Sequence, residues 1–408
     1  MKKFLSYFVQ NNGLWVFLAQ GLSKAFFFLM NLWAIRMLSK SDYGTVMLAL
    51  NFLGFFLALV GMGNYQAVLR FGALEPYTSR KMLFNYLFSI GLVRQGLVNI
   101  LMLALALVFY WNHIEVFWLI LLLSSRFLGF YFLEFSKARR RALLDNKTFA
   151  WYDIIFATLS LLLSIIFTYF WGVYGFVLAL CIAPFFILFL DRYQCQWALP
   201  NKTKQERRDL WQFSWTTALT SQVSGWIFMI DLLMIGWYLT SADVANYRVA
   251  SILPFNLLFI GHIFLQTDYA KLCKSSKNKQ HFQQYLKNYW QVIALFSVLI
   301  LGIGFWQSQL ILSLFGEDYR VVPIFRILLI STILGLMLRM PFGYLLAALG
   351  QSHWNLKIAI FINTLTFLGL YFIIPQYGIE GVAYFTLFNI ALSGLLTAMA
   401  YRVEIQKL

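Results

Sequence analysis

Apolar residues follow one another in long stretches along this chain, and short polar segments separate the stretches. A stretch of about twenty apolar residues is long enough for a helix to cross the hydrocarbon core of a bilayer. The pattern therefore predicts an all-α polytopic membrane protein with twelve transmembrane helices. The predicted helices cover residues 13–38, 44–69, 82–110, 116–135, 149–171, 175–193, 210–239, 244–270, 286–308, 323–348, 354–374 and 379–402.

The polar segments between the predicted helices differ in charge. Lysine and arginine concentrate in every second segment, and the clearest example is the basic run at residues 137–141. The positive-inside rule assigns such segments to the cytoplasm, so both termini are expected there. We interpret the net charge of +16 as this topology signal, with some attraction to anionic lipid headgroups, and not as a sign of nucleic-acid binding.

A basic segment at residues 194–209 lies at the middle of the chain. It predicts a linker between two lobes of six helices each, an N-terminal lobe of residues 1–200 and a C-terminal lobe of residues 201–408. Two lobes repeated in parallel are a common plan of transporters, in which the substrate binds in a central cavity between the lobes.

Short motifs support this repeat. LSKSDYG at 38–44 follows the first predicted helix, and LTSADVANY at 239–247 follows the seventh. GVYG at 172–175 precedes the sixth helix, and GIEG at 378–381 precedes the twelfth. The letters match weakly, so the similar positions of the motifs in the two halves carry most of this argument.

Composition excludes several classes of protein. Hydrophobic residues make up 61% of the chain and charged residues 12%, a balance that no soluble domain of this size needs. The three cysteines lack the spacing of metal ligands, so neither a metal site nor a cofactor is expected. Nucleotide-binding and hydrolase motifs are absent from the sequence, so energy for transport is expected from an ion or substrate gradient.

Several motifs keep their order over both halves of the chain. They are Leu38, Ser39, Asp42, Tyr43 and Gly44; Gly61, Gly63 and Arg70; Asp231, Tyr247 and Ala250; LFGEDY at 314–319; LLAALGQ at 345–351; and IPQYGIEGVA at 374–383. On these motifs the chain resembles the polysaccharide (O-antigen, Wzx-type) flippases of the multidrug/oligosaccharidyl-lipid/polysaccharide (MOP) exporter superfamily. A glycine is usual in that family before the tyrosine of the second turn, where this chain has Asn246.

This resemblance implies a MATE-like fold and a function. The family's members move an undecaprenyl-pyrophosphate-linked oligosaccharide, such as an O-antigen or capsule precursor, from the cytoplasmic to the outer leaflet of the bacterial inner membrane by alternating access. The implied partners are this lipid-linked substrate and membrane lipids. A proton or sodium ion is a candidate counter-ion, and a polysaccharide polymerase is a candidate protein partner.

Lys24 is the most informative charge, because it lies near the middle of the first predicted helix. Inserting a lysine at that depth costs roughly 2.5 to 3.5 kcal/mol on insertion scales, unless the ammonium group is hydrated in a cavity or paired with another group. Gln20 and Asn31 lie on the same helical face, since the three positions differ by four, seven and eleven residues. We expect this face to bind the anionic headgroup.

Arg94 and Arg126 also lie near mid-depth in their predicted helices. Guanidinium groups bind phosphate oxygens in a bidentate manner, so both are candidate ligands of the pyrophosphate. The alternative for each is a partner inside the bundle, either a helix carbonyl or a carboxylate. Arg339 lies two residues before Pro341 and either faces the cavity or pairs locally.

Asp231 lies in the seventh predicted helix, with Thr220 and Ser224 close to the same face. Such a polar stripe is typical of a water-lined cavity, where a carboxylate could bind a coupling ion. Arg248 begins the next helix at a similar depth, so an ion pair of Asp231 with Arg248 is an equally good interpretation.

Two other functions remain open. A membrane-embedded polysaccharide polymerase or ligase would use the same substrates, but it generally needs a long outer loop, and the outer loops here are short. A MATE-like multidrug antiporter would export cationic drugs, which a cavity lined by Lys24, Arg94 and Arg126 would repel. The sequence therefore favours a transporter of an anionic lipid-linked sugar.

Overall fold

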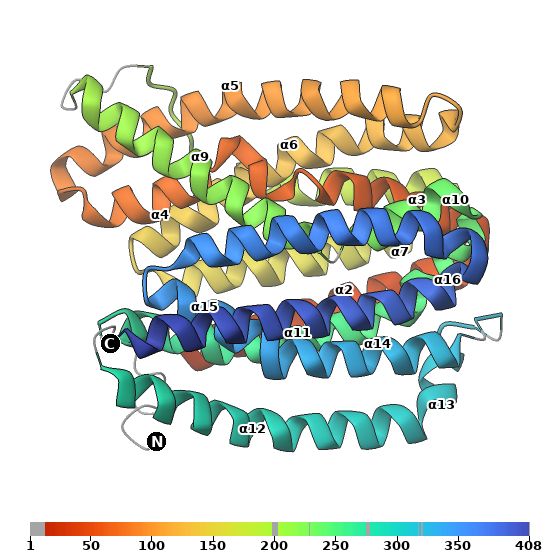
Figure 1. Ribbon diagram of the computed structural model, residues 1–408. Helices are drawn as coiled ribbons and strands as arrows, with labels where there is room; N and C mark the ends of the chain where they lie inside the picture. The colour runs from red at the N-terminus through yellow and green to blue at the C-terminus, as the bar shows by residue number, and fades with distance from the viewer. Residues whose placement is uncertain are drawn as a thin grey trace. The chain divides into compact units, whose positions relative to one another are not determined.

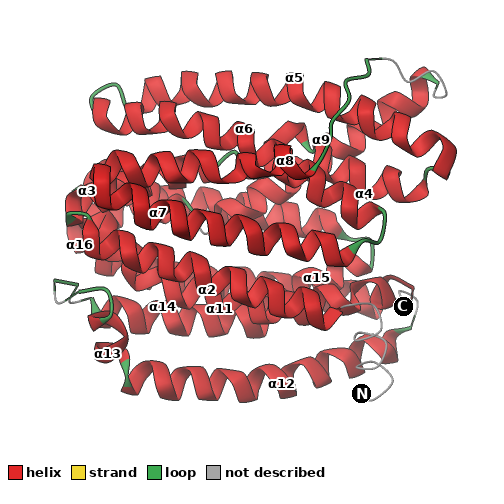
Figure 2. Cartoon of the chain, turned by 180° about the vertical axis from the view of Figure 1, so that it is seen from behind, coloured by secondary structure: helices red, strands yellow, loops and turns green. Residues whose placement is uncertain are grey.

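The computed structural model shows a helical protein, and Figure 2 draws no strand in the part that is described. The chain divides into two compact units at the boundary between Gln222 and Val223. The predicted linker at 194–209 lies inside the first unit, and the predicted division into six-helix lobes stays a prediction. The described residues are 13–197, 203–227, 229–274, 278–316, 318–319 and 321–407.

The first unit contains the helices that end before residue 222 and most of the helix that crosses this position. Within it, α2 packs along α7, and α6 contacts α3, α4, α5 and α7, so that α6 is the central helix (Figure 1). Its elements are α2 (Gly13–Met37), α3 (Lys40–Gly54), η1 (Leu57–Met62), α4 (Asn64–Leu74), α5 (Tyr77–Phe109), α6 (Ile114–Ala142), α7 (Asn146–Ile182), η2 (Ala183–Phe186), α8 (Ile187–Leu190) and the greater part of α9 (Lys204–Trp226).

The second unit is built around the last helix. There α16 packs against α10, α14 and α15, and α11 packs against α14 and α15. Its elements are α10 (Ile230–Tyr238), α11 (Ser241–Lys274), α12 (Lys279–Trp306), α13 (Ser308–Ser313), α14 (Val322–Leu334), the π-helical turn η3 (Gly335–Arg339), α15 (Met340–Ala348) and α16 (Ser352–Gln406).

The two longest helical segments are hairpins. Gly172 in α7 and Gly378 in α16 share an unusual backbone conformation, with φ of 55° and 54°. Gly175, which follows the first of these glycines, lies directly against Phe167, because a Cβ atom on Gly175 would overlap the carbonyl oxygen of Phe167. In a straight helix these two residues would be about 12 Å apart along the axis. The chain therefore reverses at both glycines, as the paired motifs GVYG and GIEG predict.

These hairpins explain the number of helices. In the described part of the chain, nine helical segments are long and apolar enough to cross a membrane, or ten if α9 and α10 together form one bent span. Two of the nine are the hairpins, each with two long arms. The structure is therefore compatible with the twelve predicted crossings, and the prediction of an all-α polytopic fold is confirmed.

Two of the predicted helices are not continuous in the structure, so these two predictions are wrong. The span predicted at 44–69 is divided among α3, η1 and α4, and the span predicted at 210–239 is divided between α9 and α10. In the first case Gly61, Met62 and Gly63 all have positive φ, which ends one helix and starts another. Hydropathy alone could not detect this break, because the apolar residues continue through it.

Side-chain amides satisfy the backbone groups that the break exposes. Gln222 on α9 accepts from Ala58 N at 2.7 Å and donates to Gly54 O at 3.3 Å. Gln95 on α5 accepts from Gly61 N at 2.8 Å. Both glutamines are buried, with exposed fractions of 2% and 0%. Irregular backbone inside a membrane protein needs such partners because no bulk water reaches it.

The turn after the first helix of each half repeats in the structure. Ser39 accepts from the backbone N–H of Asp42 at 3.1 Å and begins α3. At the equivalent place before α11, Thr240 accepts from Asp243 N at 3.3 Å, and Asp243 accepts from Thr240 N at 3.1 Å. The predicted repeat is thus present in the helix caps as well as in the two hairpins.

Candidate functional site

Lys24 has an exposed side chain on α2 and forms no hydrogen bond or ion pair with the described residues. Two charges act on it: Asp153 attracts the ammonium group, and Lys137 repels it. Lys137 is itself bound to two carboxylates, with Nζ at 2.9 Å from Glu134 Oε1 and at 2.9 Å from Asp153 Oδ1. The charge of Lys24 is therefore only partly compensated within the first unit.

The two residues that share the predicted face with Lys24 have different surroundings. Asn31 donates to Phe27 O at 2.7 Å and accepts from the hydroxyl of Tyr43 at 3.2 Å. It thereby ties the turn after the first helix to the helix itself, a structural role that the sequence analysis did not anticipate. Gln20 is half-buried and has no hydrogen-bond partner in the described part of the chain.

Arg94 lies on α5 and is half-buried. Its guanidinium carbon is 3.5 Å from the centroid of the Trp211 ring on α9, a close cation–π contact. Trp211 in turn donates from Nε1 to the hydroxyl of Tyr86 at 3.4 Å. No carboxylate among the described residues pairs with Arg94, so the Trp211 ring is the contact that faces its positive charge.

Arg126 has the internal partner that the sequence analysis held as the alternative. It is 9% exposed, and its Nη1 donates to the carbonyl oxygen of Leu180 at 2.7 Å. The guanidinium also lies 4.7 Å from the ring of Phe130. Lys24, Arg94 and Arg126 thus have separate sets of neighbours, and the described structure brings no two of them into contact.

Asp231 begins a buried network in the second unit. Its exposed fraction is 2%, and its Oδ2 accepts from the hydroxyl of Tyr247 at 2.6 Å. The same hydroxyl lies 3.2 Å from Thr386 Oγ1, and Asp231 Oδ1 accepts from Leu232 N at 2.8 Å. The partner is therefore the motif tyrosine, which the sequence analysis named only as part of a family motif.

Arg248, the expected ion-pair partner, attracts Asp231 electrostatically but does not bond to it. Its Nε is buried and has no hydrogen-bond partner among the described residues. The registers explain this difference. Tyr247 and Arg248 are adjacent on α11, so about 100° separates them, and the tyrosine faces α10. Whether Asp231 also couples an ion stays a prediction.

Replacing Tyr247 by phenylalanine is expected to lower the stability of the protein by about 1–3 kcal/mol, because a buried carboxylate loses its donor. The melting temperature of the purified protein in detergent measures this effect. Tyr238→Phe is the matched control, since the hydroxyl of Tyr238 forms no hydrogen bond in the described structure and its side chain is 41% exposed. Equal melting temperatures for the two variants would contradict the role of this bond.

The other predicted cavity residues are less informative. Thr220 donates to Thr216 O at 2.8 Å within its own helix, and Ser224 is half-buried without a hydrogen-bond partner in the described residues. Arg339 is half-buried in the π-helical turn before Pro341 and forms no ion pair with a described residue. Nothing in these contacts assigns the three side chains to a cavity.

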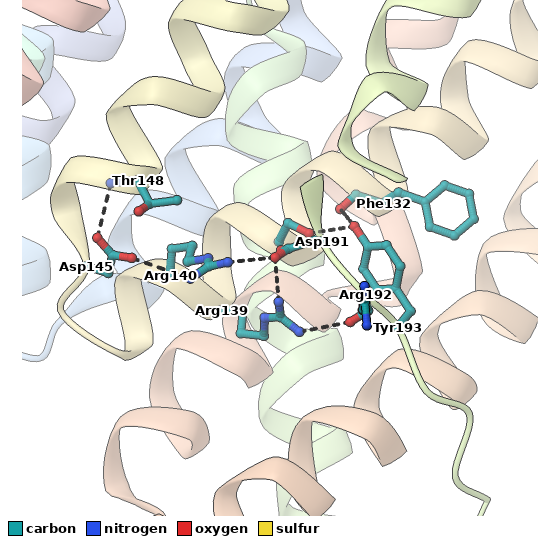
Figure 3. A network of polar contacts seen from close by, with 9 residues as sticks. Phe132, Arg139, Arg140, Asp145, Thr148, Asp191, Arg192 and Tyr193 are labelled. Carbon is teal, nitrogen blue, oxygen red and sulfur yellow. Dashed lines mark hydrogen bonds and ion pairs between the residues drawn. The ribbon is translucent and has the colours of Figure 1, made fainter. Parts of the chain in front are cut away.

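A polar network holds the basic end of α6 (Figure 3). Asp191 Oδ1 accepts from Arg139 Nη2 at 2.6 Å and from Arg140 Nη2 at 2.7 Å. Next to it, the hydroxyl of Tyr193 lies 2.6 Å from Ser136 Oγ. Burial raises the pKa of Tyr193 well above its usual range, so this hydroxyl stays neutral and available for hydrogen bonding. Two cations of the basic run therefore serve the fold.

No metal site is found in the described part of the chain, where no three histidine, cysteine, aspartate or glutamate side chains are grouped to hold an ion. Lys24 on α2 and Arg94 on α5 remain predicted ligands of an anion, and each has a different set of charged or aromatic neighbours.

Solved structures with the same fold are transporters. An inward-facing multidrug resistance MATE family transporter of the MOP superfamily has a TM-score of 0.71 and 14% identity, and the match covers 96% of this chain and 98% of that one. A mutant MATE transporter of Vibrio cholerae has a TM-score of 0.71 and 18% identity, with 100% and 98% covered. A MOP superfamily transporter of Pyrococcus furiosus, described as having a binding pocket of reverse polarity, has a TM-score of 0.66 and 12% identity, with 98% and 95% covered.

Sequence comparison identifies the family. No curated protein matches the chain. The family model described as "Polysaccharide biosynthesis protein" matches residues 33–324, which is most of the chain and includes parts of both units. The predicted resemblance is confirmed: this multi-pass membrane protein belongs to the polysaccharide biosynthesis protein family and has the fold of the MOP superfamily.

Proposed function

We propose that this protein is a flippase that moves an undecaprenyl-pyrophosphate-linked oligosaccharide, an O-antigen or capsule precursor, from the cytoplasmic to the outer leaflet of the bacterial inner membrane. The observation that carries the proposal is Lys24, a cation in the middle of an apolar helix whose charge no direct partner among the described residues neutralises. An anionic substrate would neutralise this charge when it binds, which offsets the cost of placing a lysine inside the membrane.

In this proposal Lys24 is the principal ligand of the pyrophosphate. Arg94 is the second ligand, because a ring that covers one face of a guanidinium leaves its edge N–H groups free to donate. Gln20 adds a neutral donor beside Lys24. Arg126 and Asn31 position helices through their own hydrogen bonds, and in this proposal they also contact the substrate.

The transport cycle follows from the same proposal. The two lobes alternate between inward-open and outward-open states, with both termini in the cytoplasm, and a proton or sodium ion supplies the energy. Asp231 is the candidate coupling residue, because it is the buried carboxylate of the second unit's network with Tyr247 and Thr386. A polysaccharide polymerase would then extend the glycan that this protein delivers.

Replacing Lys24 by methionine is expected to reduce export of the lipid-linked oligosaccharide about tenfold or more. A charged hydrogen bond contributes about 1.5–3 kcal/mol, and each 1.4 kcal/mol changes an equilibrium tenfold. The measurement is twofold: surface polysaccharide of cells that depend on this protein, and lipid-linked oligosaccharide at the inner leaflet by mass spectrometry. Loss of the first should accompany accumulation of the second.

Lys147→Met is the matched control, because Lys147 is an exposed lysine at the start of α7 and forms no ion pair with a described residue. Lys24→Arg should restore part of the export, since it keeps the charge. Normal surface polysaccharide in cells with membrane-inserted Lys24→Met protein would refute the headgroup role of Lys24.

A further inference from the structure

Each unit has a cavity beside its glycine hairpin. In the first unit the cavity has a volume of 510 Å³ and lies among the start of α3, the first turns of α6 and the hairpin of α7. In the second unit a cavity of 370 Å³ lies along the hairpin of α16. The residues that line the first cavity are Asp42, Thr45, Glu115, Trp118, Leu119, Leu121, Leu122, Val173 and Tyr174.

The first cavity lies far from the basic end of its unit. Glu115 is in the first turn of α6, and Arg139 is in the last turn of the same helix. At 1.5 Å per residue the two are about 36 Å apart along the helix axis. The cavity is thus at the end of the unit that faces away from the cytoplasm, if the basic run marks the cytoplasmic side as proposed.

Carboxylates and exposed aromatic rings provide the polar chemistry of this cavity. Asp42 and Glu115 are exposed, and neither carboxylate forms a hydrogen bond or ion pair with the described residues. Trp118 and Tyr174 are 55% and 69% exposed. Unpaired carboxylates beside exposed rings, around leucine side chains, leave strong acceptors and flat apolar faces available to a ligand.

The second unit repeats this combination independently. Its cavity is lined by Glu380, which forms no hydrogen bond or ion pair with the described residues, and by Tyr377 and Tyr384 with exposed fractions of 67% and 61%. Tyr377 precedes Gly378, and Tyr174 follows Gly172, so equivalent hairpins supply a tyrosine to each cavity. Although the chain has a net charge of +16, each unit thus has an acidic and aromatic cavity beside its hairpin.

We propose that these cavities bind the saccharide portion of the cargo through its hydroxyl groups. Carboxylates accept hydrogen bonds from pairs of hydroxyls, and the electron-rich faces of aromatic rings attract the C–H groups of a sugar ring. The negative charge of the cavity repels phosphate, so it complements the cationic residues of α2 and α5, which attract phosphate. The identity of the sugar as cargo rests on the proposed function; the presence of a saccharide site does not.

Binding to the purified protein tests this inference directly. The probe is maltoheptaose, a neutral oligosaccharide, and saturation-transfer NMR in lipid nanodiscs detects its contact with the protein. Trp118→Leu is expected to remove the part of the transfer that comes from the first cavity, about half of the total, and the double variant Asp42→Asn with Glu115→Gln is expected to weaken binding at that cavity about tenfold. Trp111→Leu is the matched control, because Trp111 lies at the same end of the unit, is 71% exposed and does not line the cavity.

Two results would overturn the inference. One is maltoheptaose transfer that is absent at millimolar concentration, or that is equal in Trp118→Leu and Trp111→Leu. The other is displacement of the sugar by tetramethylammonium, which would identify an organic-cation site instead, since carboxylates with aromatic rings also bind such cations. Neither result depends on export. A failed saccharide test together with lost export in Lys24→Met would refute this inference and leave the proposed function standing.

Discussion

Replacing Gly63 by alanine is expected to destabilise the protein by roughly 2–5 kcal/mol and to remove most of the folded material. Gly63 has φ of 80°, a conformation that costs an L-residue roughly 1–2 kcal/mol. A Cβ atom at this position would also overlap the carbonyl oxygen of Ser214 on α9, and overpacking of this kind costs roughly 1–3 kcal/mol. The backbone of α9 can retreat only by losing the contacts that cover the break between η1 and α4.

The yield of monodisperse protein after detergent extraction and its melting temperature measure this effect. Two glycine variants separate its causes. Gly172→Ala has open space around it but a backbone of φ 55° and ψ −129° that L-residues rarely adopt, so it should show a cost of backbone strain without any overlap. Gly96→Ala, within α5, has open space and no positive φ, so it should be neutral or slightly stabilising. A Gly63→Ala protein as stable as Gly96→Ala would show that α9 does not pack on the break as described.

Replacing Asp191 by asparagine is expected to lower stability by about 3 kcal/mol, equivalent to about 3–4 °C in the melting temperature of a chain of 408 residues. The side chain of Asp191 is 1% exposed and receives both Arg139 and Arg140. The variant leaves Arg139 without a carboxylate partner among the described residues, and it leaves Arg140 with the more exposed Asp145 alone. The effect lies at the lower end of the range for buried pairs, because the arginine side chains are 20% and 27% exposed and water screens them in part.

Asp145→Asn is the matched control for this experiment. Asp145 contacts Arg140 at 3.5 Å, and its side chain is 34% exposed, so losing its charge should change stability by less than about 1 kcal/mol. The network in Figure 3 predicts a clear order of the two variants. If Asp145→Asn is as destabilising as Asp191→Asn, the buried position of Asp191 is not what matters.

The transmembrane helices could be predicted because their signal is local. A run of apolar residues long enough to cross a bilayer needs no knowledge of its neighbours, and glycine motifs mark the hairpins at Gly172 and Gly378. The break after α3 could not be predicted in this way. Its backbone is stabilised by Gln222, which is 164 residues from Ala58, and only the folded chain shows that pairing.

Partners of charged residues were harder to predict than their depth. The cost of burying Arg126 was evident from the sequence, but its bond to the carbonyl of Leu180 depends on how α6 and α7 pack. Tyr247 and Arg248 are adjacent on α11, so their separation from Asp231 in the sequence does not distinguish them. The register of the helix turns Tyr247 toward Asp231. Lys24 differs from Arg126 and Asp231, because it has no hydrogen-bond or ion-pair partner among the described residues. The sequence analysis expected the anionic headgroup of the substrate to be its partner.

Gln222 holds the break in the second helix through the carbonyl of Gly54 and the amide of Ala58, which are groups that every amino acid except proline presents. These hydrogen bonds of Gln222 therefore depend on the conformation of the main chain and not on which side chains it carries. Across related proteins, residues at positions 55–58 should be free to vary among apolar types, whereas position 222 should tolerate little beyond glutamine. Covariation between these segments would consequently be weak, although the contact satisfies two backbone groups at the break.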